Sequence, residues 1–250
     1  MFSALPMPKV SWNEKNMRLL LPAFPLVGVM TGLLEALWIC ISIRLSFPVF
    51  LTAAVICAVP VLVTGGIHLD GYMDVSDALS SYGDAGKRRE ILSDPHIGAF
   101  AVIHAAVLMI LYFGFASALP LRKGPILLFG CSFVVSRCLS GLAVSVLPLS
   151  KETGLARTFQ DAADRRLSIT LLGAELFAAS VVMIVGGAVL GGGTCAAAAI
   201  LMICCAAGQW LYLRRTAAKK FGGLSGDLNG WFLVKAELWM LGALVLVTII

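Results

Sequence analysis

The chain has 250 residues, of which 59% are hydrophobic and 13% are charged, and its mean hydropathy is +0.93. Soluble domains carry about 25% charged residues, so this composition indicates a polytopic membrane protein surrounded by the lipid bilayer. The formal net charge of +5 comes from 19 Lys and Arg against 14 Asp and Glu. No segment is long and polar enough to form a basic, water-facing domain, which argues for no nucleic acid among the partners.

Apolar segments near the length of about 20 residues that a spanning helix needs recur along the chain. They predict an all-α fold with about seven transmembrane helices, at residues 19–43, 47–66, 97–118, 125–147, 168–190, 194–213 and 231–250. Prolines in or near the first two segments, such as Pro25 and Pro60, predict kinks or broken helices there. The seven cysteines lie in apolar runs without a CxxC pair and are predicted to be small core side chains.

The connections between these segments alternate in charge. Fourteen of the 19 basic residues fall in the N-terminal segment and after the second, fourth and sixth spans, whereas the opposite connections carry only Arg44, Arg122 and Lys123. By the positive-inside rule the basic side is cytoplasmic, which places the N-terminus inside and the C-terminus outside. We therefore expect residues 1–18 to form a cytoplasmic segment and residues 19–250 to form a single transmembrane domain.

The most informative motif follows the second span, where residues 65–77 read GGIHLDGYMDVSD. Asp70, Asp74 and Asp77 recur at i, i+4 and i+7, which places them on one face of an α-helix. No Lys or Arg lies within one helical turn of them, so these like charges need a cation to neutralise them. Oxygen ligands at this density suit Mg²⁺, which proteins often hold through a few carboxylates together with substrate phosphates.

Basic residues follow this acidic stripe. Lys87, Arg88 and Arg89 open a predicted short helix that runs to Ser93 and stops near Pro95. Cationic side chains beside a metal-binding stripe are what a diphosphate substrate requires. Ordinary positive-inside topology is the alternative explanation for at least one of the three.

Other candidates lie before the stripe and in two later loops on the basic side. The loop after the fourth span carries Arg157, and the loop before the last span carries Gly226 and Asp227 among closely spaced glycines. Such glycines let backbone N–H groups approach an anion, and the aspartate is a candidate ligand for a metal or a substrate hydroxyl. His68 precedes the stripe directly and is either a base or phosphate contact or a hydrogen-bonded histidine at the membrane boundary.

Charged residues within predicted spans are functional candidates because their burial is costly. Glu35 and Arg137 lie deep enough in their segments to pair with each other. Glu237 and Lys235 lie close to the start of the last span, where we expect them to reach the interface.

The run at residues 65–77 closely resembles the defining motif of the cobalamin synthase (adenosylcobinamide-GDP ribazoletransferase) family, which is Gly-Gly-x-His-Leu-Asp-Gly-x-x-Asp-x-x-Asp. Three further segments resemble motifs of that family in the expected order, namely FPLVG at 24–28, SDPHIG at 93–98 and GGLSGD at 222–227. Pro95 and His96 depart from the small polar or basic residues expected in the second of these segments. Together the motifs extend over most of the chain.

The resemblance implies a Mg²⁺-dependent transferase in a bacterial cytoplasmic (inner) membrane, with its active site facing the cytoplasm. Such enzymes join adenosylcobinamide-GDP to α-ribazole or its 5′-phosphate, release GMP, and so form adenosylcobalamin or its 5′-phosphate. The implied partners are these two substrates, and a homo-oligomer or an association with other corrinoid-assembly enzymes is left open.

We therefore expect roles for individual residues, both within a catalytic cytoplasmic loop at 66–96 and in the two later loops. Asp70, Asp74 and Asp77 would hold one or two Mg²⁺ ions, and His68 would assist deprotonation of the nucleophile. The expected catalytic residues are His68, Asp70, Asp74, Asp77 and Asp94, and the expected substrate-binding residues are Lys87, Arg88, Arg89, Arg157, Gly226 and Asp227.

Three other classes of protein use related features. A CDP-alcohol phosphotransferase would show Ala-Arg after its Asp-Gly, which is absent after Asp70-Gly71. A membrane prenyltransferase would present two well-separated Asp-rich motifs, and this chain has one strong cluster. A cation transporter would place carboxylates near the middle of the bilayer, whereas the stripe is predicted at a cytoplasmic boundary.

Overall fold

The computed structural model describes residues 18–150 and 155–249, so most of the predicted N-terminal segment lies outside the described residues. Within those ranges the chain is almost entirely helical and contains no β-strand beyond one isolated bridge, which confirms the predicted all-α fold. The first helices are α2 (Phe24–Leu45), α3 (Val49–Thr64), α4 (Ile67–Ser80), α5 (Ala85–Ile91), α6 (Ala99–Ala118) and α7 (Lys123–Val146). They are followed by α8 (Leu155–Ala162), α9 (Arg165–Val181), the π-helix η1 (Val182–Gly186), α10 (Gly187–Thr216), the π-helix η2 (Ala217–Phe221) and α11 (Gly226–Ile249).

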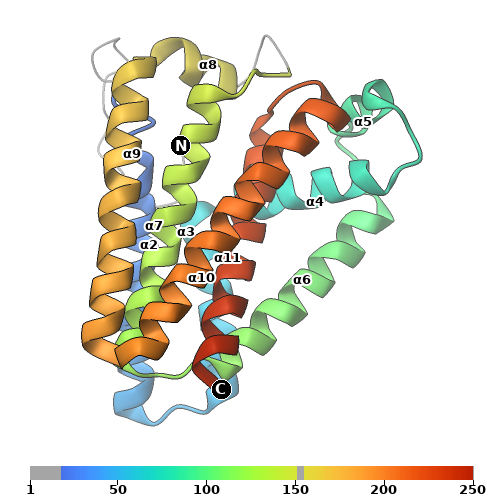
Figure 1. Ribbon diagram of the computed structural model, residues 1–250. Helices are drawn as coiled ribbons and strands as arrows, with labels where there is room; N and C mark the ends of the chain where they lie inside the picture. The colour runs from blue at the N-terminus through green and yellow to red at the C-terminus, as the bar shows by residue number, and fades with distance from the viewer. Residues whose placement is uncertain (1–17, 151–154, 250) are drawn as a thin grey trace.

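Five helices in the described ranges are long and apolar enough to cross a membrane, or six if the bent pair α3 and α4 is taken as one span. One of the five, Arg165–Phe221, has 57 residues, and a straight helix of that length would be about 85 Å long, more than twice the bilayer core. Gly192 interrupts it with φ 71° and ψ −164°. The stretches before and after this glycine run in opposite directions (Figure 1). If these two stretches are counted as two passes and the pair α3 and α4 as one, the helices match the seven predicted segments. Gly192 then lies in the glycine connection that was predicted between the fifth and sixth segments.

The break between α3 and α4 is made by two glycines and not by a proline. Gly65 and Gly66 have φ values of 65° and 82°, in the left-handed region that glycine adopts at little cost. Their N–H groups donate to the carbonyl oxygens of Leu62 and Val61, the paired bonds of a Schellman cap. The chain therefore turns through 95°, whereas Pro60 lies inside a continuous α3.

The core of the bundle runs along α7 and α11. The most apolar window of each is 61% buried, against 33% for α2 and 22% for α6. The outer helices expose large apolar side chains such as Leu33, Val107 and Phe177, as lipid-facing surfaces do. Figure 1 shows α4 and α5 at one end of the bundle and the C-terminus at the other.

Candidate functional site

The predicted acidic stripe lies on α4, at the end of the bundle where the chain leaves α3. Asp70 is exposed in the first turn, and Asp74 and Asp77 are half-buried. The free N–H groups and the dipole at a helix N-terminus favour a carboxylate at this first position. None of the three carboxylates forms an ion pair within the described part of the chain. They therefore form a group of uncompensated negative charges.

Asp227 joins this group through a close contact between α4 and α11. A Cβ atom built on Gly71 would lie 2.8 Å from the backbone oxygen of Asp227 and 2.9 Å from its Cα. The first turn of α11 is fixed by Ser225, whose Oγ accepts a hydrogen bond from the N–H of Leu228 at 3.2 Å. Charge on Asp74 is opposed by charge on Asp70, Asp227 and Asp77, which places these three carboxylates within electrostatic reach of Asp74.

The loop between α5 and α6 approaches the last residue of the stripe. The carboxylate of Asp77 lies directly against Gly98, where a Cβ atom would overlap it. Asp94, predicted to be catalytic, is exposed on the same loop and bonds to His96 through that residue's N–H at 2.9 Å and its Nδ1 at 2.6 Å. These hydrogen bonds hold the pKa of Asp94 below its usual range. Asp94 therefore lies on the loop that contacts Asp77, but its carboxylate is bonded within that loop to His96.

The predicted basic residues lie in two places, on α5 and on α8. Lys87 forms an exposed ion pair with Glu90 at 3.0 Å, whereas the guanidinium of Arg89 lies beside Gly222, in the loop that leads to α11. Arg157 is on α8, where it pairs with Asp161 at 2.8 Å. Because α8 lies on the other side of the bundle end from α5 (Figure 1), the structure does not bring Arg157 to the stripe.

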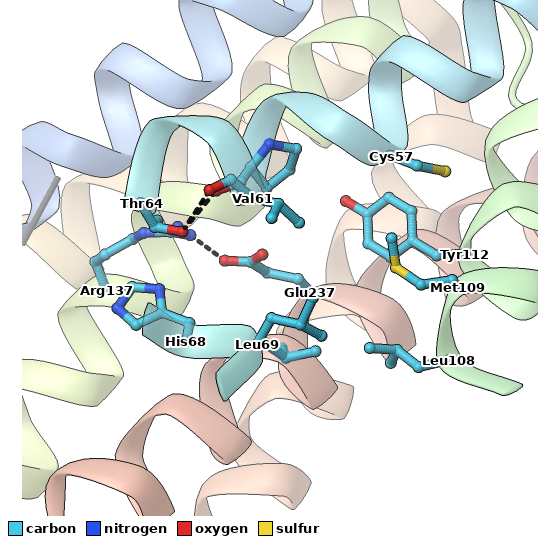
Figure 2. A pocket seen from close by; sticks show the side chains of 12 residues that line it. Cys57, Val61, Thr64, His68, Leu69, Leu108, Met109, Tyr112, Arg137 and Glu237 are labelled. Atoms are coloured by element: carbon cyan, nitrogen blue, oxygen red, sulfur yellow. Dashed lines mark hydrogen bonds and ion pairs between the residues drawn. The ribbon is translucent and has the colours of Figure 1, made fainter. Parts of the chain in front are cut away.

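His68 points away from the stripe. At about 100° per residue, the three aspartates lie about 180–240° around α4 from His68. Its ring lies edge-on to that of Phe24, with centroids 6.0 Å apart, and it lines a cavity of about 40 Å³ below α4. Figure 2 shows this ring beside Arg137 in the cavity. The structure therefore does not place His68 with the carboxylates that it was expected to assist.

The suggested pair between Arg137 and Glu35 is wrong. Arg137 forms a buried ion pair with Glu237 across α7 and α11 (Figure 2), and Ser136 Oγ donates to the same carboxylate at 3.1 Å. Glu237 is therefore a core residue and does not reach the interface, because α11 is a central helix. Both oxygens of Glu35 are buried and have no hydrogen-bond partner among the described residues. Lys235 lies over two aromatic rings, 4.3 and 4.6 Å from their centroids.

The donor chemistry of the acidic group suits Mg²⁺, but its side chains do not form a closed cage. In the described ranges, no three His, Cys, Asp or Glu side chains are placed to hold one metal ion. Mg²⁺ typically keeps several waters and is held by one or two carboxylates plus substrate phosphates. The oxygen donors at Asp70, Asp74, Asp77 and Asp227 fit such an open site.

These features define a polytopic α-helical membrane protein with an acidic site at one end of its bundle. The model of the cobalamin-5-phosphate synthase family matches residues 1–245. The chain therefore belongs to this family, which confirms the resemblance seen in its motifs, and it is an enzyme.

Curated relatives match over nearly the whole chain. A protein of Lachnoclostridium phytofermentans is 38% identical over 247 residues, covering 95% of this chain and 87% of the relative. Proteins of Geobacillus kaustophilus and Clostridium perfringens are 31% and 28% identical, covering 96% and 95% of this chain and 90% and 91% of the relatives. All three are named adenosylcobinamide-GDP ribazoletransferase. No solved structure matches the chain.

Proposed function

We propose that this chain joins adenosylcobinamide-GDP to α-ribazole, or to its 5′-phosphate, and releases GMP. The observation that carries the proposal is the contact of Gly71 with Asp227, because it brings the stripe on α4 and the first turn of α11 into one acidic site. The cations of α5 lie at the same end of the bundle, where a diphosphate would need them. The names of the relatives support this choice of substrates.

The transfer exchanges one phosphorus–oxygen bond for another. A ribose hydroxyl of the ribazole attacks the phosphorus on the corrinoid side, and its proton passes to a base or to water. The bond to the GMP oxygen breaks, and GMP leaves with the bonding electrons. Arg88 and Arg89 neutralise phosphoryl oxygens as negative charge moves toward the leaving group.

Asp70, Asp74, Asp77 and Asp227 are the residues that would hold Mg²⁺. When bound there, the ion supplies charge stabilisation to the phosphoryl oxygens and to the leaving group. Gly71 keeps the two helices close enough for Asp227 to share the site with Asp74.

We also propose that the acidic site faces the cytoplasm across a bacterial inner membrane, with the N-terminus inside. The basic residues support this orientation. Those on α5, η2 and the ends of α9 and α10 lie at the end of the bundle that carries α4, and Arg44, Arg122 and Lys123 lie at the other end. The positive-inside rule then assigns the first end to the cytoplasm.

The test measures GMP release from adenosylcobinamide-GDP by the protein in proteoliposomes, with and without Mg²⁺ and with α-ribazole or its 5′-phosphate. Asp74→Asn should lower the rate by at least about a thousandfold because it removes a carboxylate that meets three others. Asp161→Asn, an exposed change on α8, is the matched control and should retain wild-type activity. Wild-type rates in Asp74→Asn would overturn the assigned site, and absence of GMP release by the wild type would overturn the reaction.

A further inference from the structure

Four basic residues lie on α5 and η2, two helices that pack together beyond the end of α10. The π-helix η2 packs against α5 and carries Lys219 and Lys220, both exposed. From the facing element come Arg88, which is half-buried, and Arg89, which lies beside Gly222. We call these residues the α5–η2 cluster. Neither the motifs of the sequence nor the family resemblance assigns a role to the two lysines.

The carboxylate of Asp84, at the start of α5, acts electrostatically on Arg88 and Arg89 but is not ion-paired with either of them. Within the described ranges, none of its members forms an ion pair. The Nε of Arg88 is buried and has no hydrogen-bond partner there. Leaving a buried donor without a partner is unfavourable, so a ligand that supplies an acceptor would be favoured at this point.

The cluster and the acidic site lie on either side of one short loop, which runs from Phe221 to Gly226. Hydrogen bonds hold the backbone of this loop in place. Leu224 donates its N–H to Pro148 at 2.8 Å and accepts from Ser150 at 2.9 Å, which fixes the loop against the end of α7. A Cβ atom on Gly223 would lie 2.5 Å from the Ser150 nitrogen, so the loop depends on this glycine.

A ligand that neutralises both groups must present a metal-binding phosphate to the carboxylates and a second anionic group to the cations. A diphosphate has this form. If the phosphorus under attack lies at the carboxylates, the neighbouring phosphate of the diphosphate faces the α5–η2 cluster. That second phosphate gains charge as the bond to it breaks, and fixed cations act most strongly where charge develops in the transition state.

We propose that the α5–η2 cluster binds the phosphate of the nucleotide half of the substrate, the half that leaves as GMP. This inference rests on the proposed function and adds Lys219 and Lys220 to the site. Arg88 and Arg89 supply forked donors that match phosphoryl oxygens, and the lysines supply point charges. The same phosphoryl chemistry is found in anionic lipid headgroups, so the test must separate the two sources.

The test compares a double variant, Lys219→Gln with Lys220→Gln, with a matched control, Arg122→Gln with Lys123→Gln. The control removes two exposed basic residues from the opposite end of the bundle. Both are reconstituted in nanodiscs of zwitterionic lipid and in nanodiscs that contain anionic lipid. The readouts are the KM for adenosylcobinamide-GDP, the KM for α-ribazole, and the inhibition constant of GMP.

A charge-assisted contact contributes roughly tenfold in affinity. We expect the lysine variant, which removes two such contacts, to raise the KM for adenosylcobinamide-GDP and the inhibition constant of GMP by about 100-fold in both lipids. The KM for α-ribazole and all values of the control should change less than about twofold. An unchanged inhibition constant of GMP in the lysine variant would overturn the proposal. A loss of affinity for adenosylcobinamide-GDP seen only in anionic lipid would overturn it in favour of a lipid contact. Because the wild type is measured in parallel, its failure to release GMP would instead count against the proposed function.

Discussion

At the scale of single residues, the buried ion pair between Arg137 and Glu237 is the feature that sequence reasoning placed wrongly. Arg137 is 1% exposed and Glu237 is 7% exposed. Both were visible as charges within apolar segments, but their pairing depends on α7 and α11 packing together at the centre of the bundle. A single sequence shows how deep a residue lies within its own helix. It does not show which other helix that residue faces.

Removing one partner of this pair should be more damaging than removing both. Arg137→Met leaves the Glu237 carboxylate buried without its cation, and a broken buried pair typically costs about 3–5 kcal/mol. Replacing Glu237 by Met as well removes the orphaned charge and should recover most of the lost stability. Thermal unfolding in detergent, followed for the single and double variants, measures the difference. If the double variant is as unstable as the sum of the two single variants, the ion pair does not contribute as described.

At the scale of helices, much of the architecture was predictable. Apolar length located the spans, and the period of the aspartates placed Asp70, Asp74 and Asp77 on one helix face, which α4 confirms. The position of the break was missed because prolines were expected to make it, whereas Gly65 and Gly66 do so through positive φ angles. Asp227 was a candidate from its glycine-rich surroundings, but its contact with α4 requires the tertiary packing.

That contact gives a prediction about Gly71. In Gly71→Ala, the new Cβ would lie 2.8 Å from the Asp227 backbone oxygen, so α11 must move away from α4. Because small displacements of catalytic groups are costly, we expect GMP release to fall by about 10² and half-maximal activation to need more Mg²⁺. Stability should also fall, although alanine favours helix formation by about 1 kcal/mol relative to glycine.

Gly173→Ala is the matched control for this substitution. It makes the same change within α9, where a new Cβ meets nothing within 4 Å, and it should keep wild-type activity with equal or greater stability. Steady-state kinetics over a range of Mg²⁺ concentrations, together with thermal unfolding, separates the two variants. Equal activity in both would show that the distance between α4 and α11 does not matter to the site.

At the scale of the whole molecule, the distribution of charge and the fold lead to the same arrangement. The helix ends rich in Lys and Arg meet at the end of the bundle that also carries the acidic site. Sequence alone established this asymmetry, because alternate connections must lie on opposite sides of a membrane. It could not establish that α5, η2 and the first turn of α11 are neighbours, since that depends on how the spans pack around α7 and α11.

The orientation in the membrane follows from this asymmetry and can be tested directly. Tyr82, whose side chain is fully exposed, lies between α4 and α5, and Lys123 lies at the opposite end of the bundle. In a cysteine-free variant, Tyr82→Cys should react with a membrane-impermeant maleimide in inverted vesicles and not in intact spheroplasts. Lys123→Cys should show the reverse pattern, because the positive-inside rule predicts that the end richer in Lys and Arg faces the cytoplasm. Labelling of Tyr82→Cys from the outside would place the acidic site away from the compartment where nucleotide-activated substrates are expected, and would overturn both the orientation and the route by which substrate reaches the site.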